Sequence, residues 1–333
     1  MPFMEDKIAT LFETFSGNKG RLEALPLSGS ARRYYRISDD GSTYIGVYNA
    51  ALEENDLFIR FSRHFKAYGL RVPRILEVAE DGLTYLQEDL GRKTLLDVVQ
   101  EQCRDGKWSE ACMGLYRQAL SELLRFQFVP GMDYSSCVPR PVFDRRSIQW
   151  DLNYFKYCFL RLYGAAFSED ALEDDFSALL DQVCAVPART FMFRDFQSRN
   201  IMVKEDGVWF IDYQGGRQGA LHYDVASLLY DAIVAMPDAQ REELLDYYIR
   251  ELQAYAPVGQ EKFRRDYHRF VLIRLLQALG AFGLRGLHER KPHFLDSIAP
   301  GVQSVHHLFE SGKLGTDYPE IRRIIRNISL SEG

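Results

Sequence analysis

The sequence of 333 residues has few cysteines and no pattern that would bind zinc or build a disulfide framework. Its five cysteines are odd in number, and no two of them form a Cys-x-x-Cys pair. Such a chain is typical of a reducing compartment, so we expect a cytoplasmic protein. An excess of basic residues is also absent, because 41 Lys+Arg stand against 47 Asp+Glu, for a formal net charge of -6. This balance argues against nucleic acid as a partner.

Long apolar runs are missing as well. The most apolar helical stretch, residues 270–284, is interrupted by Arg274 and Gln277 and is shorter than the ~20 residues that cross a bilayer. The first residues do not combine a basic segment with an apolar one, so they do not predict a secretory signal. We therefore expect no membrane anchor. The patterns G-x-G-x-x-G and G-x-x-x-x-G-K-[ST] are absent too, which argues against a P-loop enzyme.

What remains is the composition of an ordinary folded protein, with 46% hydrophobic and 26% charged residues. Because single cores stop growing at roughly 250–300 residues, we expect two lobes. Short β-forming runs dominate the first quarter of the chain, whereas helical periodicity dominates after residue 94. We predict an α+β fold with a small antiparallel sheet in an N-terminal lobe, residues 1–88. The C-terminal lobe, residues 89–333, is predicted to be mostly helical.

The hydrophobic patterns also predict individual elements. In the first lobe, strands are predicted over residues 22–27, 34–37, 43–48, 75–79 and 83–87, and helices over 6–15 and 57–65. In the second lobe, helices are predicted near residues 94–103, 109–128, 147–163, 169–184, 223–234, 239–255, 260–285 and 317–328. One β hairpin interrupts these helices. It joins residues 201–203 to residues 208–212 through the turn-forming Glu-Asp-Gly at 205–207.

Three polar residues at the ends of these β segments form the strongest candidate site. Asp195 follows the apolar run 191–193, Asn200 lies five residues later, and Asp212 ends the hairpin. Because the hairpin folds back on itself, these side chains can meet at one point. Phosphoryl transfer from ATP needs a carboxylate that accepts the proton of an attacking hydroxyl, and oxygen ligands for Mg²⁺. We predict Asp195 as the base and Asn200 and Asp212 as metal ligands; the alternative is a polar hairpin with both carboxylates in turns.

The segment from residue 191 to residue 229 resembles the catalytic core of the aminoglycoside phosphotransferase family, relatives of the protein kinases that include choline kinase. The similar pieces are Arg-Asp-Phe-Gln-Ser-Arg-Asn at 194–200, Ile-Asp-Tyr-Gln at 211–214, and the run 217–229. Within the family, the sequence is most similar to the bacterial anomeric kinases of N-acetylmuramate and N-acetylglucosamine. The resemblance implies a bilobal protein-kinase-like fold that uses ATP and Mg²⁺.

The resemblance implies the same roles for the three residues of the candidate site and adds others. It makes Asp224 a support for the catalytic loop, whereas the local pattern alone also permits Asp224 to be a helix N-cap. Residues 87–91 are similar to the family's hinge, where the backbone around Glu88 and Leu90 would hold adenine. The alternative for the hinge is a charged linker.

The segment from Ser30 to residue 36 resembles the family's phosphate-covering turn, which makes Ser30, Arg32 and Arg33 candidates for nucleotide binding. One departure concerns the third strand, residues 43–49, which lacks the lysine that kinases use to pair the nucleotide phosphates. Arg32 or Arg33 can supply that positive charge from the turn. The alternative is that both arginines lie at a solvated hairpin tip.

The acceptor is predicted less directly. Trp150 and Tyr154, in the helix predicted over 147–163, combine aromatic and polar groups as a sugar site does, although helical spacing alone favours a core-packing face. Arg217 can meet an anionic substituent or a phosphate oxygen, and Gln214 can reach the acceptor or brace the loop. These features favour a small-molecule sugar acceptor. An aminoglycoside or choline acceptor, or a nucleotide-binding scaffold without catalysis, remains an alternative, and the sequence leaves the oligomeric state open.

Overall fold

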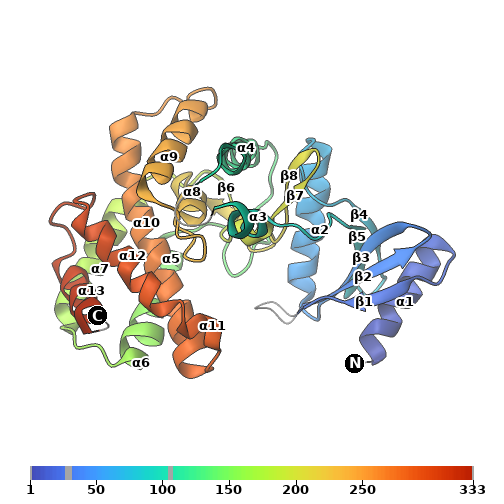
Figure 1. Cartoon of the computed structure of the whole chain (residues 1–333), viewed down its shortest axis with the longest axis horizontal. Helices are drawn as coiled ribbons and strands as arrows, with labels where there is room; N and C mark the ends of the chain where they lie inside the picture. Colours follow the sequence, from blue (N-terminus) through green and yellow to red (C-terminus); the bar gives the residue numbers. More distant parts are fainter. Residues whose placement is uncertain (1, 27–31, 104–107, 332–333) are drawn as a thin grey trace.

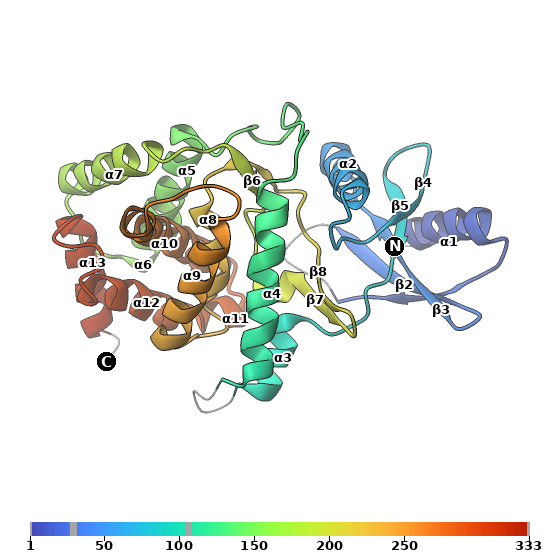
Figure 2. The ribbon, with the colours of Figure 1, turned by 90° about the horizontal axis from the view of Figure 1, so that it is seen from above.

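The computed structural model describes residues 2–26, 32–103 and 108–331. A sheet with two long helices lies at one end of the molecule, and a larger, mostly helical region lies at the other (Figures 1 and 2). The predicted α+β architecture is therefore confirmed. A division after residue 88 remains our proposal, since β5 ends there and the chain then passes into helices.

The N-terminal sheet has five strands, all paired antiparallel, in the order β1-β2-β3-β5-β4. Its strands are β1 (Arg21–Ala24), β2 (Arg33–Asp39), β3 (Ser42–Tyr48), β4 (Ile75–Val78) and β5 (Thr84–Glu88). Helix α1 (Pro2–Ser16) packs on one face of the sheet, and α2 (Leu52–Ala67) lies on the face toward the helical region (Figure 1).

The side chains of β3 show why the two helices can cover the two faces. Successive side chains of a strand point to opposite faces, so Ile45 and Val47 join the core with α2 while Gly46 faces α1. A Cβ added to Gly46 would lie 2.4 Å from Cγ2 of Ile8. Only glycine therefore permits this close approach of α1 to the sheet.

The helical region is built around α10 (Gln260–Phe282), which contacts α5, α8 and α12. Its other helices are α3 (Leu95–Gln102), α4 (Glu110–Gln127), α5 (Arg145–Phe155), α6 (Arg161–Tyr163), α7 (Glu169–Cys184), α8 (His222–Leu229), α9 (Asp238–Leu252), α11 (Pro292–Leu295), α12 (Ile298–Glu310) and α13 (Pro319–Ser331). Wider π-helical turns follow α5 and α10, as η1 (Lys156–Leu160) and η3 (Gly283–His288).

Two helical predictions need correction. Residues 292–310, for which the sequence predicts no helix, form α11 and α12. The helix predicted over 223–234 ends at Leu229. The chain leaves the helix there, and Asp231 directs its carboxylate to the backbone N–H and the hydroxyl of Ser198 instead.

The apolar stretch near residue 270 is longer than the sequence suggests. Residues 260–288 form a helical segment of 29 residues that contains a window apolar enough, by length and composition, to cross a membrane. In the fold, 61% of that window is buried. Because α10 packs against α5, α8 and α12, this segment is the central core helix of the helical region.

Two short sheets lie beside the junction of the two regions and position the candidate site (Figure 2). β7 (Ile201–Lys204) pairs with β8 (Gly207–Phe210), which confirms the predicted hairpin. β6 (Thr190–Met192) pairs antiparallel with β9 (Arg217–Gly219), a pairing that the sequence does not predict. The second pairing brings the loop after β6 next to the loop after β8.

Candidate active site

The three residues predicted for catalysis and metal binding lie together. Asn200 closes a short 3₁₀ turn, Ser198–Asn200, between β6 and β7. Its Nδ2 donates to the backbone oxygen of Asp195 at 2.9 Å and to Oδ2 of Asp212 at 3.1 Å. One amide group thus joins both predicted loops.

Asp212 is the most constrained of the three. Its backbone has a φ of +65°, in the left-handed region, which costs an ordinary residue roughly 1–3 kcal/mol and is common at functional sites. Nε2 of Gln214 donates to Oδ1 of Asp212 at 2.7 Å, so Gln214 braces the loop. Burial and the nearby charge of Asp195 raise the pKa of Asp212 above its ordinary value, although Gln214 opposes this shift.

These residues fit a divalent cation. Two carboxylates that repel each other and an amide supply the oxygen ligands that Mg²⁺ prefers. The buried Oε1 of Gln214 accepts no hydrogen bond from the described residues, although it lies beside Asp212. No group of three or more His, Cys, Asp or Glu side chains in the described part of the chain could hold a metal. A cation here would therefore depend on the amide as well as on the carboxylates.

Arg194, directly before the predicted base, makes contacts that the sequence does not predict. Its guanidinium donates to both carboxylate oxygens of Asp151, at 2.6 and 2.7 Å, and to the hydroxyl of Tyr223 at 2.6 Å. It lies 4.9 Å from the ring centre of Phe143 and 5.1 Å from that of Tyr223. These contacts hold the backbone of Arg194 at a φ of +79°, in the left-handed region.

Asp224 holds the backbone of the same loop. It is 0% exposed, and its carboxylate accepts from the backbone N–H of Phe193 at 2.8 Å and from that of Arg194 at 3.1 Å. The N-cap interpretation is wrong, because α8 begins at His222 and Leu221 occupies the cap position. Burial raises the pKa of Asp224 to about 7, although the two backbone N–H groups lower it.

Sequence reasoning missed two further acidic residues that fix the loop. Asp231 is 5% exposed and accepts from the backbone N–H of Ser198 at 3.1 Å and from its hydroxyl at 2.7 Å. Asp151 lies among the buried residues of α5, between Ile148 and Leu152. A carboxylate on an apolar helix face indicates a buried partner. That pattern could have drawn attention to Asp151, but it does not identify Arg194.

The two aromatic residues proposed for the acceptor differ in burial. Trp150 is 44% exposed, so the core-packing alternative is wrong for it. Tyr154 is half-buried where α5 crosses α10, and its Cδ1 would lie 2.7 Å from a Cβ added to Gly280. Helix α5 therefore exposes Trp150 and also carries Asp151. A role for Trp150 and Tyr154 in binding an acceptor stays a prediction.

Arg217 is buried rather than extended toward solvent. It is 8% exposed, and its Nε and Nη2 donate to the backbone oxygen of Gly215 at 3.1 and 2.9 Å. Burial, followed by the charge of Arg194, lowers the pKa of Arg217. No carboxylate of the described residues lies within ion-pair distance of it. This environment favours an anion near Arg217. The predicted contact of Arg217 with an anionic substituent or a phosphate oxygen is our proposal.

The residues of the turn predicted to bind the nucleotide lie in different environments. Ser30 lies outside the described residues. Arg32 is 3% exposed and forms an ion pair with Glu54, so it does not lie at a solvated hairpin tip. Arg33 is half-buried, and its Nη1 donates to the backbone oxygen of Arg32 at 3.5 Å.

The predicted hinge is held by an ion pair. Arg36 of β2 donates to both carboxylate oxygens of Asp89, at 2.6 and 3.0 Å. The carboxylate of Glu88 lies 3.7 Å from Nζ of Lys204, which joins the hinge to β7. Leu90 is 5% exposed. Binding of adenine by the backbone at Glu88 and Leu90 stays a prediction.

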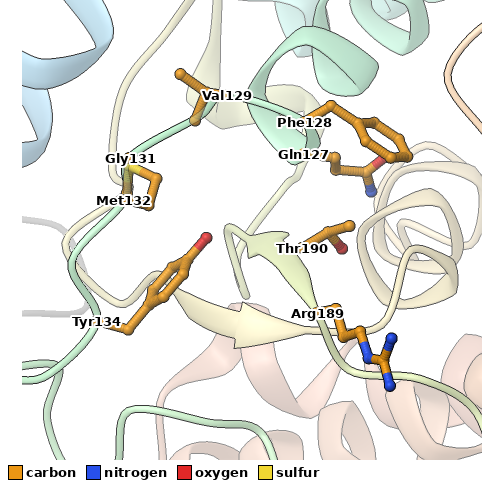
Figure 3. Close-up of a pocket in the computed structure, with 8 residues that line it drawn as sticks. All are labelled: Gln127, Phe128, Val129, Gly131, Met132, Tyr134, Arg189 and Thr190. Atoms are coloured by element: carbon orange, nitrogen blue, oxygen red, sulfur yellow. The ribbon is translucent and has the colours of Figure 1, made fainter.

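Two cavities lie near these elements. One of about 920 Å³ is lined by hinge residues 89–93 and the hairpin turn 203–206, among others, beside the predicted adenine position. The other, of about 380 Å³, lies at the end of α4 beside β6 and contains none of the predicted site residues. Figure 3 shows that the hydroxyl of Tyr134 points into this second cavity, whereas the guanidinium of Arg189 points away.

The fold is an antiparallel sheet joined through a hinge to a helical lobe, and two aspartates and an asparagine lie together on adjoining loops. Together these features define the class of kinase-like phosphotransferases. The sequence profile of the Phosphotransferase enzyme family matches residues 21–259. The chain belongs to this family and is a phosphotransferase. The family expected from the motifs is confirmed.

Curated relatives are sugar kinases by name. The chain is 28% identical over 287 residues to the N-acetylmuramate/N-acetylglucosamine kinase of Pseudomonas putida, across 84% of this chain and 80% of the relative. It is also 28% identical over 286 residues to the protein of the same name in Pseudomonas aeruginosa, across 83% of this chain and 80% of the relative.

Solved structures share the fold at low identity. A choline kinase from Cryptosporidium parvum has a TM-score of 0.63 and 12% identity, and the match covers 96% of this chain and 99% of that chain. A thermostable mutant of aminoglycoside phosphotransferase APH(4)-Ia with ADP and hygromycin B has a TM-score of 0.56 and 18% identity, with 92% and 98% covered. At these identities the likeness shows the fold, and it confirms the bilobal protein-kinase-like prediction.

Proposed function

We propose that this chain is an ATP-dependent kinase that phosphorylates an amino sugar at its anomeric hydroxyl, with Mg²⁺ as the second cofactor. The convergence of Asp195, Asn200 and Asp212 around one point carries this proposal. It supplies a base and metal ligands, which phosphoryl transfer requires. A role in the recycling of cell-wall sugars belongs to the same proposal.

In the proposed mechanism, each residue of the two loops has one task. Asp195 orients the acceptor hydroxyl and accepts its proton during transfer. Asn200 and Asp212 would hold Mg²⁺, which when bound would neutralise charge on the nucleotide phosphates. Gln214 fixes the carboxylate of Asp212, and Asp224 fixes the backbone immediately before Asp195. These contacts support a site in which the loop of Asp195 and the carboxylate of Asp212 would be held in place before the substrates bind.

Three observations support a sugar over a cationic acceptor. The curated relatives carry the name N-acetylmuramate/N-acetylglucosamine kinase. In addition, Asp151 is paired at both oxygens with Arg194, so this carboxylate is already neutralised and offers little to an aminoglycoside or to choline. The buried, positively charged Arg217 lies near Arg194 and supports an acceptor with an acidic substituent.

The experiment that tests the proposal is ATP consumption with a panel of acceptors, followed by phosphorus NMR of any product. The panel contains N-acetylmuramate, N-acetylglucosamine, glucose, hygromycin B and choline. We expect turnover with the N-acetylated sugars of the order of 1–100 s⁻¹ and a resonance of an anomeric phosphate. Turnover only with hygromycin B or choline would contradict the acceptor, and binding of ATP without transfer to any member would favour the non-catalytic scaffold.

A further inference from the structure

The third strand of the sheet lacks the lysine that kinases place there. In protein kinases this lysine pairs with the nucleotide phosphates and with a glutamate of the helix that follows. Here that helix is α2, and the β3 residues on its side of the sheet are Ile45 and Val47, which are 6% and 0% exposed. A positive charge for the phosphates must therefore come from another element.

Arg32 brings a positive charge to the same face of the sheet. Arg32 directly precedes β2 and lies two residues before Tyr34, which pairs with Val47 of β3. Its contact with Phe58 of α2 places its side chain on the side of α2. It is 3% exposed, and its Cζ lies 5.8 Å from the ring centre of Phe58 in α2.

Glu54, in the first turn of α2, is the carboxylate partner of this arginine. Nη2 of Arg32 lies 3.4 Å from Oε2 of Glu54. The same oxygen accepts from Nδ2 of Asn49 at 3.1 Å, and Oδ1 of Asn49 accepts from the backbone N–H of Ala51 at 3.1 Å. The buried Asn49 therefore ties Glu54 to the start of α2. The result is a cation paired with a carboxylate of the helix, as in kinases, but with the cation directly before the neighbouring strand β2 and not on β3.

Arg32 is also electrostatically close to the proposed metal ligand. Burial and Asp195 raise the pKa of Asp212, and Arg32 is among the groups that lower it. Burial lowers the pKa of Arg32, whereas the nearby Tyr85, Tyr34 and Asp212 raise it. Ring contacts lead from Arg32 toward Asp212. Cζ of Arg32 lies 5.8 Å from the ring centre of Phe58, and Phe58 stacks on Tyr213, the residue after Asp212, with ring centres 4.8 Å apart.

We propose that Arg32 binds phosphate oxygens of the nucleoside triphosphate and that Glu54 positions it, so that this pair replaces the missing lysine and glutamate pair. The inference rests on the proposed function of the site. A planar guanidinium can donate two parallel hydrogen bonds to a phosphate. Arg32 would then hold the nucleotide from the sheet, opposite Asp212, and the chain would need no lysine in β3.

The test is equilibrium titration of the full chain with two probes, AMP-PNP and adenosine, in the presence of Mg²⁺. We expect Arg32→Met to weaken the binding of AMP-PNP by about 10- to 100-fold, the range for lost charge-assisted hydrogen bonds, and to leave adenosine unchanged. Arg32→Lys should recover part of the affinity. Glu54→Gln should weaken AMP-PNP by less than Arg32→Met, since Glu54 acts through Arg32.

A matched control removes a more exposed arginine–carboxylate pair that lies within α2. Arg60 pairs with Asp56 on α2 at 2.8 Å, and we expect Arg60→Met to bind both probes as the parent does. Unchanged AMP-PNP affinity in Arg32→Met, or an equal loss for both probes, would overturn the inference. If Arg32→Met fails to fold, Arg32→Lys and Glu54→Gln take its place, and their affinities for AMP-PNP and adenosine are compared with those of the parent. A parent chain that binds no AMP-PNP would instead refute the proposed function.

Discussion

Single residues carry the proposed chemistry, and Asp195 is the first to test. We expect Asp195→Asn to lower kcat by about 100-fold or more, because an amide cannot accept the acceptor's proton. The affinity for AMP-PNP should change little, since the backbone oxygen that receives the Asn200 amide is retained. Steady-state kinetics and titration measure the two effects. Full activity in this variant would show that another group is the base.

Asp224 predicts a pH effect at the same scale. Its pKa is about 7 in the folded chain, chiefly through burial, against an ordinary value of 3.8. The folded state therefore holds a proton that the unfolded state releases between pH 3.8 and about 7, so ionisation of Asp224 lowers the free energy of unfolding as the pH rises through that window.

The variant Asp224→Asn removes this titration. We expect the difference in the free energy of unfolding between parent and variant to shift in the variant's favour from pH 4 to pH 7, as urea denaturation at several pH values would measure. Activity should nevertheless fall, because an asparagine cannot accept from both Phe193 and Arg194 through two oxygens. A difference that stays constant across the window would contradict the buried, protonated state of Asp224.

At the scale of elements, helix α2 connects the sheet to the catalytic loop. The ring of Phe58 stacks on Tyr213 with centres 4.8 Å apart, and the hydroxyls of Ser62 and Tyr213 lie 2.6 Å apart. Since Tyr213 directly follows Asp212, the position of α2 and that of the proposed metal ligand are coupled. The same helix carries Glu54, so one element orients both sides of the proposed nucleotide site.

Close helix packing gives a prediction for stability. Gly283 begins η3, where an added Cβ would lie 1.9 Å from the backbone oxygen of Cys158 in η1. We expect Gly283→Ala to lower the free energy of unfolding by about 1–3 kcal/mol or more, because backbone atoms must move. The control is Gly114→Ala in α4, where nothing lies within 4 Å, and this change should stabilise the helix by roughly 0.5–1 kcal/mol. Urea denaturation of both variants measures the contrast, and equal effects would contradict it.

At the scale of the whole molecule, nucleotide binding should join the two lobes. We expect AMP-PNP with Mg²⁺, at about 100 times its dissociation constant, to raise the free energy of unfolding by ~2.7 kcal/mol. In Asp212→Asn the part of this stabilisation that depends on Mg²⁺ should be lost, while the variant itself stays folded. Thermal and urea denaturation with and without Mg²⁺ would measure it. An unchanged Mg²⁺ dependence in Asp212→Asn would remove the ligand role of this residue.

The whole molecule also bears on where the protein works. All five cysteines are free in the structure, and Cys184 is exposed. Free thiols suit a reducing compartment, so the cytoplasmic location stays our prediction. The apolar window of α10 belongs to the core of the helical region. It therefore gives no reason to place the chain in a membrane.

Local pattern was sufficient for much of this protein. The five strands, most helices and the hairpin between Asp195 and Asp212 follow from periodicity and turn residues, because these depend on neighbours in the chain. The proximity of Asp195, Asn200 and Asp212 could be predicted for the same reason, since a tight hairpin brings its own ends together.

Only the tertiary structure decided which distant partners meet. Arg194 lies 43 residues from Asp151, Ser198 lies 33 from Asp231, and Arg32 lies 22 from Glu54. Nothing in the local sequence selects among many charged residues, because each pairing depends on how helices and sheet pack against one another. The sequence by itself therefore determined the fold class and the proposed reacting groups, whereas the packing of the chain decided what holds those groups in place.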